Sequence, residues 1–222
     1  MTPRLLHVTL GAADVWCSGA DLGSMTEAAN RGALARAAEL PDPVGWVWLR
    51  QMHGVRIVDA ADAPAAEQEA DASVTTTHGR PLAIVTADCA PIVVANDSAC
   101  AAVHAGHRGL LAGIVEASVA AVETRGTGSV RAFLGPCIRA ECYEFGADAL
   151  EPFIEQYGRE VATTTASGRA ALDIPVAVRA ALARAGVSEL IDSGVCTSHT
   201  PGYFSFRRDG TADRQVTVAV LR

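Results

Sequence analysis

The sequence lacks the features that mark membrane proteins and nucleic-acid-binding proteins. It has no apolar run near the roughly 18 residues of a membrane span, and residues 1–13 carry too little charge and apolar length for a signal peptide. No basic cluster is longer than Arg207 and Arg208, and 25 acidic residues outnumber 18 basic ones. The positive surface that binds nucleic acid is therefore missing. We expect a cytoplasmic protein with a small-molecule partner and no nucleic-acid or membrane partner, while the oligomeric state is not predicted.

The six cysteines give no sign of a disulfide framework or a compact zinc knuckle. No C-x-x-C pair is present, and Cys137 and Cys142 have four residues between them, which suits neither a zinc knuckle nor a thioredoxin-type motif. Without a secretory signal the compartment is expected to be reducing. Most of the thiols should therefore be buried as small hydrophobic side chains.

Linkers, low-complexity tracts and internal repeats are also absent from the sequence. Because 50% of the 222 residues are hydrophobic, the chain can bury a substantial core. We expect one domain over residues 1–222. Short apolar runs alternate with Ala-rich stretches, which predicts an α+β fold, a single-domain mixed α/β sandwich.

The strands are predicted from short apolar, β-branched runs and the helices from the spacing of apolar residues. Strands are expected at 46–49, 55–58, 81–85, 92–95, 101–103, 130–134, 190–195 and 216–221. Helices are expected at 25–40, 110–122, 147–156 and 174–185, and an exposed loop at 60–70. The helix at 110–122 begins near Arg108, so its free backbone N–H groups could face an anion.

Three short segments that carry a thiol or an imidazole are the most informative part of the chain. Cys89 lies in TADCAP at 86–91, His104 in VHAGHRG at 103–109 and His53 in QMHG at 51–54. Their spacing does not match a local zinc finger, so a shared site would have to be assembled by the fold. Taken singly, a buried thiol and hydrogen-bonded core or turn histidines are the ordinary alternatives.

The same three residues admit more than one chemistry. Two imidazoles and a thiolate can hold Zn²⁺ and leave a fourth position for water or substrate, as in a catalytic zinc site. Alternatively, a Cys89 thiolate paired with an imidazole can attack an acyl or amide carbon, which would make the protein a cysteine-dependent amide or ester hydrolase. A zinc-binding protein without catalysis, acting through a partner, is the alternative that is not an enzyme.

Polar and aromatic residues near these segments are further candidates. Asp88 can orient a water or a histidine, or simply cap its turn. Arg108 can bind phosphate or a developing anion, with a surface ion pair as the alternative. Arg207 and Arg208 are adjacent, so in an extended strand at most one of them faces the site. Aromatic residues can wall a pocket for a flat ring or pack in the core, and those in question are Tyr143, Phe204 and Phe206.

The ordered motifs resemble those of the laccase-domain proteins, also called YfiH-like or polyphenol oxidase-like, which are regarded as purine nucleoside-metabolising enzymes. Besides the three segments above, the resemblance is carried by ADASVT at 70–75, GPCI at 135–138, YEFG at 143–146, LDI at 172–174, CT at 196–197 and FSFRRDG at 204–210. These motifs lie in the same order from Gln51 to near the C-terminus. The ordered set is specific, although no single motif is decisive.

The resemblance implies a fold, a cofactor and an activity. It implies a single mixed α/β domain with Zn²⁺ held by His53, Cys89 and His104. It also implies phosphorolysis of adenosine, inosine, guanosine or methylthioadenosine to base and ribose 1-phosphate, with adenosine deamination as a further activity. The matching motifs assign catalysis to Cys89, Asp88 and Arg108, and substrate binding to Gln51, Arg108, Arg207 and Phe204. The older laccase label would need several coppers and more ligands than six scattered histidines supply.

Two positions depart from the family's pattern. His107 stands where the family usually has Trp, and Leu10 stands where an Arg is expected in an N-terminal motif. We expect His107 at the rim of the pocket, mostly neutral at pH 7 because Arg108 disfavours its protonated form, and not bound to the metal. If the Arg of that motif binds phosphate, Leu10 affects phosphorolysis and not zinc binding.

Overall fold

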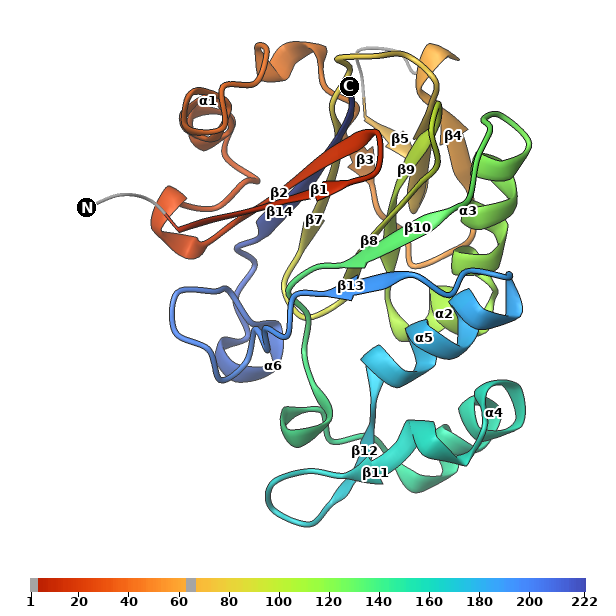
Figure 1. Cartoon of the computed structure of the whole chain (residues 1–222). Helices are drawn as coiled ribbons and strands as arrows, with labels where there is room; N and C mark the ends of the chain where they lie inside the picture. Colours follow the sequence, from red (N-terminus) through yellow and green to blue (C-terminus); the bar gives the residue numbers. More distant parts are fainter. Residues whose placement is uncertain (1–3, 63–66) are drawn as a thin grey trace.

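Two β-sheets pack face to face and carry helices on their outer faces (Figure 1). The structure is a computed structural model that describes residues 4–62 and 67–222. The predicted fold class, a single mixed α/β domain of the sandwich type, is confirmed by this arrangement. Within the described ranges, no helix has the length and apolar character needed to cross a membrane.

Sheet A has four antiparallel strands. In spatial order they are β1 (Leu5–Leu10), β2 (Ala13–Ser18), β14 (Gln215–Leu221) and β7 (Leu82–Thr86). The central strand β14 is buried on both faces, because Val216, Val218 and Val220 pack on the side of helix α1 (Ala28–Ala37) while Ala219 and Leu221 face the second sheet. This alternation follows the two-residue period of a strand.

Sheet B has six strands. In spatial order they are β13 (Leu190–Asp192), β10 (Arg131–Leu134), β8 (Ala90–Ala95), β9 (Cys100–Ala105), β6 (Ala72–Thr75) and β4 (Ile57–Asp59). In β9, Ala101 and Val103 belong to the core beneath the helices, whereas Cys100 and Ala102 face sheet A. His104 has the same parity as Cys100 and Ala102, so its side chain points toward the space between the sheets, at the end of the strand.

The remaining elements cover sheet B or connect the two sheets. Helices α2 (His107–Leu111) and α3 (Ile114–Glu123) lie on sheet B, and α4 (Ala147–Tyr157) and α5 (Ile174–Arg184) pack against these helices and each other. The short strand pairs are β3 (Leu49–Arg50) with β5 (Gln68–Glu69) and β11 (Ala162–Thr164) with β12 (Ala170–Leu172), and α6 (Phe206–Asp209) lies in the C-terminal loop. The chain therefore forms four layers, in the order α1, sheet A, sheet B and helices α2 and α3, with α5 and α4 packed against the last layer (Figure 1).

Most of the predicted elements are confirmed, with shifted ends. The strands expected at 81–85, 92–95, 101–103, 130–134 and 216–221 are β7, β8, β9, β10 and β14, and the helices expected at 147–156 and 174–185 are α4 and α5. The predicted strands at 46–49, 55–58 and 190–195 are shorter or displaced, since β3, β4 and β13 contain only two or three residues each. Continuous apolar runs identify the long strands because these strands are buried on both faces.

Other expectations were wrong in part. The helix predicted at 25–40 is only Ala28–Ala37, because Met25 is buried against sheet A in an irregular segment. The helix predicted at 110–122 is two helices, α2 and α3, separated at Gly113, whose φ is 86°. The loop expected at 60–70 contains a 3₁₀ turn and the short strand β5, and its residues 63–66 lie outside the described residues. Strands β1 and β2 were not predicted.

Candidate active site

The turn between β7 and β8 carries Cys89 from sheet A to sheet B. In this turn Asp88 has φ 94°, a conformation that is costly for a residue with a Cβ. Its carboxylate accepts hydrogen bonds from Thr197 Oγ1 (2.6 Å) and from the backbone N–H of Arg207 (2.6 Å), and its carbonyl accepts one from the N–H of Ile138 (2.9 Å). Asp88 therefore ties the turn to the C-terminal loop and holds Cys89 at a half-buried position.

Asp71 organises both histidines of the candidate site. Its buried carboxylate accepts the backbone N–H groups of residues 52–54 at 2.7 to 3.2 Å, which folds the loop that carries His53 into a left-handed turn with φ 60°. The same carboxylate lies 2.8 Å from Nδ1 of His104. Because an ionised carboxylate only accepts hydrogen bonds, Nδ1 of His104 carries a proton and Nε2 is left as the nitrogen that can bind a metal.

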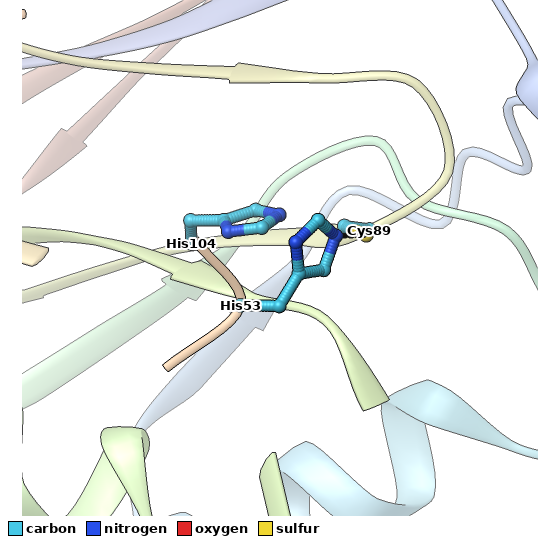
Figure 2. Close-up of side chains that lie close together, drawn as sticks. All are labelled: His53, Cys89 and His104. Atoms are coloured by element: carbon cyan, nitrogen blue, oxygen red, sulfur yellow. Dashed lines mark hydrogen bonds between the residues drawn. The ribbon is translucent and has the colours of Figure 1, made fainter. Parts of the chain in front are cut away.

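The three predicted metal ligands converge. Their donor atoms all lie within 4.8 Å of one another, and Sγ of Cys89 is 3.8 Å from Nε2 of His53. The two imidazole rings meet nearly edge to face, with centroids 4.7 Å apart (Figure 2). Gly106 permits this approach, since a Cβ at that position would lie 2.7 Å from Cδ2 of His53. The fold thus assembles a group that no local sequence spacing encodes.

The charges of the group favour a thiolate. Burial alone would raise the pKa of Cys89, but its interactions with His104 and His53 lower that pKa to about 6. Burial likewise disfavours the charged form of His104, yet the hydrogen bonds to Asp71 and Cys89 raise its pKa to about 9. The thiolate is the form of cysteine that binds metals and that acts as a nucleophile, so the geometry supports both chemistries.

A cavity of about 610 Å³ opens in front of this group. Its volume is within the usual range for a small-molecule site. It is lined by Thr26, Gln51, His53, Val85, Thr86, Ala87, Asp88, Cys89, His104, His107, Tyr143, Phe206, Arg207, Ala212 and Arg214. The wall therefore combines the three candidate ligands with aromatic rings and two guanidinium groups.

Two of the residues predicted to bind substrate line the cavity. The side-chain amide of Gln51 is already paired with β7, because its Nε2 donates to the carbonyl of Val85 (2.8 Å) and its Oε1 accepts from the Val85 N–H (2.9 Å). The guanidinium of Arg207 lies over the ring of Tyr143, 4.8 Å from its centroid, and donates to the carbonyl of Glu144. Both side chains are thus held in fixed orientations at the cavity wall.

Arg108 and Phe204 do not line this cavity. Arg108 is exposed at the start of the five-residue helix α2, and its guanidinium has no hydrogen-bond or ion-pair partner in the described part of the chain. Phe204 is half-buried, and its N–H donates to Gln215. Of the adjacent pair, Arg207 faces the cavity, whereas Arg208 bonds to backbone carbonyls of the same loop, although both lie in helix α6 and not in an extended strand.

His107 and Leu10 occupy very different surroundings. His107 lines the cavity with Nδ1 3.5 Å from the hydroxyl of Tyr143, and burial together with the charges of Arg108 and His53 lowers its pKa. It is therefore neutral at pH 7. Leu10 is buried at the end of β1 in the core between the sheets and does not line the cavity.

Asp71 and Arg214 are candidate functional residues that sequence reasoning missed. Asp71 stood in a motif that was noted, ADASVT, directly before a buried strand, and this position of an acid was the signal available. Arg214 stands in no recognised motif, and only its place between α6 and β14 brings it to the cavity. Its Nη1 donates to the carbonyls of Thr211 and Asp213, which fixes the side chain at the wall.

The fold and the site together define a class of protein, a four-layer α/β domain with a His/Cys/His group in the wall of a small-molecule cavity. Residues 23–222 match the family described as multi-copper polyphenol oxidoreductase laccase. The chain belongs to this laccase-domain, YfiH-like family.

Related proteins and solved structures of similar fold are consistent with this family. The chain is 37% identical over 202 residues to a purine nucleoside phosphorylase, SCO2081, of Streptomyces coelicolor, covering 88% of this chain and 82% of that protein. It is 35% identical over 192 residues to the purine nucleoside phosphorylase YfiH of Escherichia coli, covering 85% and 78%. The crystal structure of Neisseria meningitidis protein NMB0706 superposes with a TM-score of 0.83 at 27% identity over 98% of both chains. YlmD of Geobacillus stearothermophilus gives 0.84 at 26% identity, over 96% of this chain and 93% of that chain.

Proposed function

We propose that this protein is a zinc-dependent purine nucleoside phosphorylase that converts adenosine, inosine, guanosine or methylthioadenosine to base and ribose 1-phosphate, with adenosine deamination as a further activity. The observation that carries the proposal is the convergence of His53, Cys89 and His104 in the wall of a cavity that also presents arginines and aromatic rings. The names of the related proteins support the same reaction.

The donor set fits a zinc ion. Two imidazole nitrogens and a thiolate are soft to borderline ligands, and Nδ1 of His104 is held by a carboxylate as in many zinc sites. Three protein ligands leave a position open toward the cavity. A zinc ion held there would supply Lewis-acid polarisation of a substrate group.

The remaining cavity residues suit the other parts of the substrates. Tyr143 and Phe206 present rings against which a purine can stack. Arg207 and Arg214 present guanidinium groups that can hold a phosphate dianion while its oxygen attacks C1′ of the ribose and the C–N bond to the base breaks. Arg108, next to His107 at the cavity wall, is the further candidate for anion binding.

The test is product analysis with purified protein. Each of the four nucleosides is incubated with and without phosphate, and bases, inosine and ribose 1-phosphate are separated chromatographically. We expect release of base only with phosphate, and loss of turnover in Cys89→Ser by about 100-fold or more, as for removal of a metal ligand or a nucleophile. Arg214→Ala should raise the KM for phosphate more than Arg108→Ala does, because only Arg214 lines the cavity.

A matched control is His78→Ala, which removes an exposed imidazole outside the cavity and should leave turnover unchanged. If zinc-loaded wild-type protein converts none of the nucleosides, the proposal is wrong. Base released equally well without phosphate would show a hydrolase, and inosine formed from adenosine would show the deaminase reaction.

The lowered pKa of Cys89 also favours one alternative, a cysteine-dependent amide or ester hydrolase. Metal analysis separates the two. Zinc in stoichiometric amount that is lost in Cys89→Ser supports ligation, whereas a metal-free protein whose Cys89 is rapidly alkylated supports the nucleophile. Zinc that stays bound with no turnover of any substrate would favour a zinc-binding protein without catalysis, and copper in place of zinc would overturn the cofactor assignment.

A further inference from the structure

A second group of metal-binding side chains lies outside the candidate active site. It consists of Cys142, Cys196 and His199, whose ligand atoms all lie within 4.8 Å of one another. Sγ of Cys142 is 3.5 Å from Nδ1 of His199, and a carboxylate oxygen of Glu141 is 3.3 Å from the same nitrogen. None of these residues lines the cavity described above.

The spacing of these atoms matches the edges of a tetrahedral metal site. With Zn–S near 2.3 Å and Zn–N and Zn–O near 2.0 Å, neighbouring S and N ligands lie about 3.5 Å apart, and N and O ligands about 3.3 Å apart. Cys142 and His199 have the first separation, and His199 and Glu141 have the second. Two thiols and one imidazole therefore have the chemistry and the spacing of three donors of such a site, and the Glu141 carboxylate lies beside the imidazole.

Cys142 differs in exposure from the cysteines that only pack. Cys17, Cys100 and Cys137 are fully buried, as expected for packing thiols. Cys196 is buried, but Cys142 beside it is partly exposed and the His199 side chain is 56% exposed, so an ion can reach the group from solvent on that side. Packing alone does not account for two thiols beside an accessible imidazole.

The local backbone holds the donors on two rigid segments. Glu141 and Cys142 end a 3₁₀ turn at Ala140–Cys142. Cys196 pairs in a parallel β-bridge with Cys137, and the chain then turns so that the N–H of Thr200 donates to the Cys196 carbonyl (3.0 Å). The turn brings His199, three residues after Cys196, back over the thiols. Donors that are held in place in this way bind a metal with little loss of chain entropy.

We propose that Cys142, Cys196 and His199 bind a second soft divalent cation of the zinc class, with the fourth position left to water or to the Glu141 carboxylate beside His199. This proposal does not rest on the proposed function. The ion joins two segments far apart in the sequence, and each is next to a residue of the active-site region. Cys142 precedes Tyr143 of the cavity wall, and Cys196 precedes Thr197, which bonds to Asp88. The bound ion would therefore fix the C-terminal loop against the wall of the cavity.

The test is metal stoichiometry after dialysis of the reduced protein against zinc and a weak chelator. We expect about two ions per chain in the wild type, about one in Cys89→Ser, about one in His199→Ala and about none in the double variant. The second site is measured by the one zinc ion per chain that His199→Ala removes, both from the wild type and from Cys89→Ser. If the first group binds no zinc, the wild type and Cys89→Ser each hold one ion, and His199→Ala still removes it.

The matched control is His7→Ala, because His7 is another exposed imidazole beside a carboxylate, with Asp14 3.4 Å away. His7 belongs to neither candidate metal group of the described residues, so its removal should leave the number of bound zinc ions unchanged. His199→Ala lies on an exposed turn, and its circular dichroism should match that of the wild type. Equal zinc content in His199→Ala and the wild type would overturn the proposal.

Cobalt substitution gives a second readout. In Cys89→Ser the cysteines left in a candidate metal group of the described residues are Cys142 and Cys196, so Co²⁺ bound there should produce thiolate-to-metal charge-transfer absorption that Cys142→Ser abolishes. The same ion should raise the melting temperature of Cys89→Ser and not that of Cys89→Ser with His199→Ala. Absence of the absorption in fully reduced Cys89→Ser, with a Cys142–Cys196 disulfide found by mass spectrometry after air exposure, would also overturn the proposal.

Discussion

Asp71 shows how much of the candidate site depends on a single carboxylate that touches no substrate. It accepts three backbone N–H groups from residues 52–54 and the Nδ1–H of His104. Burial would raise its pKa, but these hydrogen bonds lower it, so the group is ionised at neutral pH. Asp71 thus fixes the backbone that carries His53 and the imidazole of His104, while Cys89 comes from the turn between the two sheets.

Asp71→Asn should weaken metal binding at His53, Cys89 and His104. An amide places an NH₂ group against backbone donors and removes the negative charge that His104 faces. Loss of such a supporting contact costs about 10- to 100-fold in metal affinity. The measurement is competition with a chromophoric chelator, carried out in the His199→Ala background so that only this site is read.

Asp59→Asn is the control for that substitution. Asp59 also accepts a backbone N–H and pairs with an arginine, Arg125, but it does not line the cavity. Its loss should leave metal affinity unchanged. Equal affinity in Asp71→Asn and the wild type would contradict the positioning role of Asp71.

The candidate ligands could be predicted from the sequence, whereas their supporting residues could not. His53, Cys89 and His104 can be singled out because each lies in a short motif beside an apolar strand and because the ordered motifs resemble those of the family. Which residues support them depends on long-range pairing. Arg214 reaches the cavity only because β14 pairs with β7, and no local pattern encodes that approach.

At the scale of elements, the sequence predicted the strands that are buried on both faces. It missed strands that are buried on one face and the break within a helical segment. Strands β7, β8 and β9 read as unbroken apolar runs. Strands β1 and β2 mix polar residues such as His7, Thr9 and Asp14 into a hairpin at the sheet edge, so they lack this signal. Apolar spacing continues across α2 and α3 because both helices pack on sheet B, which hides the break between them.

That break is testable at Gly113. Its φ of 86° is strained for any residue with a Cβ, although a Cβ there would meet only the Glu116 carboxylate at 3.8 Å. Gly113→Ala should therefore lower the free energy of unfolding by about 1–2 kcal/mol through backbone strain alone. The measurement is urea unfolding followed by circular dichroism.

Gly32→Ala is the matched change in a regular helix. Gly32 lies within α1, and a Cβ there would lie 3.5 Å from Arg36 Nη1, an ordinary contact with a flexible side chain. This change should raise the free energy of unfolding by about 0.5–1 kcal/mol. Destabilisation of equal size by both substitutions would show that the left-handed conformation at Gly113 is not the cause.

At the scale of the whole molecule, Asp192 should contribute to the loss of folding stability at low pH. This residue ends β13 and pairs with the guanidinium of Arg139, and both side chains are mostly buried. Burial would raise the pKa of Asp192, but the hydrogen bonds from Arg139 and from the Gly194 N–H lower it. A carboxyl whose folded pKa lies below its unfolded value stabilises the fold above the unfolded pKa, and this contribution is lost as pH falls through the folded pKa.

Asp192→Asn should therefore destabilise the protein by about 2 kcal/mol at neutral pH. The gap in melting temperature between the variant and the wild type should narrow as the pH is lowered below about 4, where the carboxyl of the unfolded chain takes up its proton. Differential scanning fluorimetry over this range makes the comparison. A gap that stays constant on acidification would contradict the ionic origin of the stabilisation.

The pairing of Gln51 with Val85 has a consequence for the solubility of the protein. Strand β7 is the last strand of sheet A, and the backbone of Val47 covers its outer edge at Pro81 and Ala83. The Gln51 amide occupies the N–H and the carbonyl of Val85 as a neighbouring strand would. Val47 and Gln51 together thus shield an apolar sheet edge from edge-to-edge aggregation, and a substitution of Gln51 made to examine chemistry would also uncover the backbone groups of Val85.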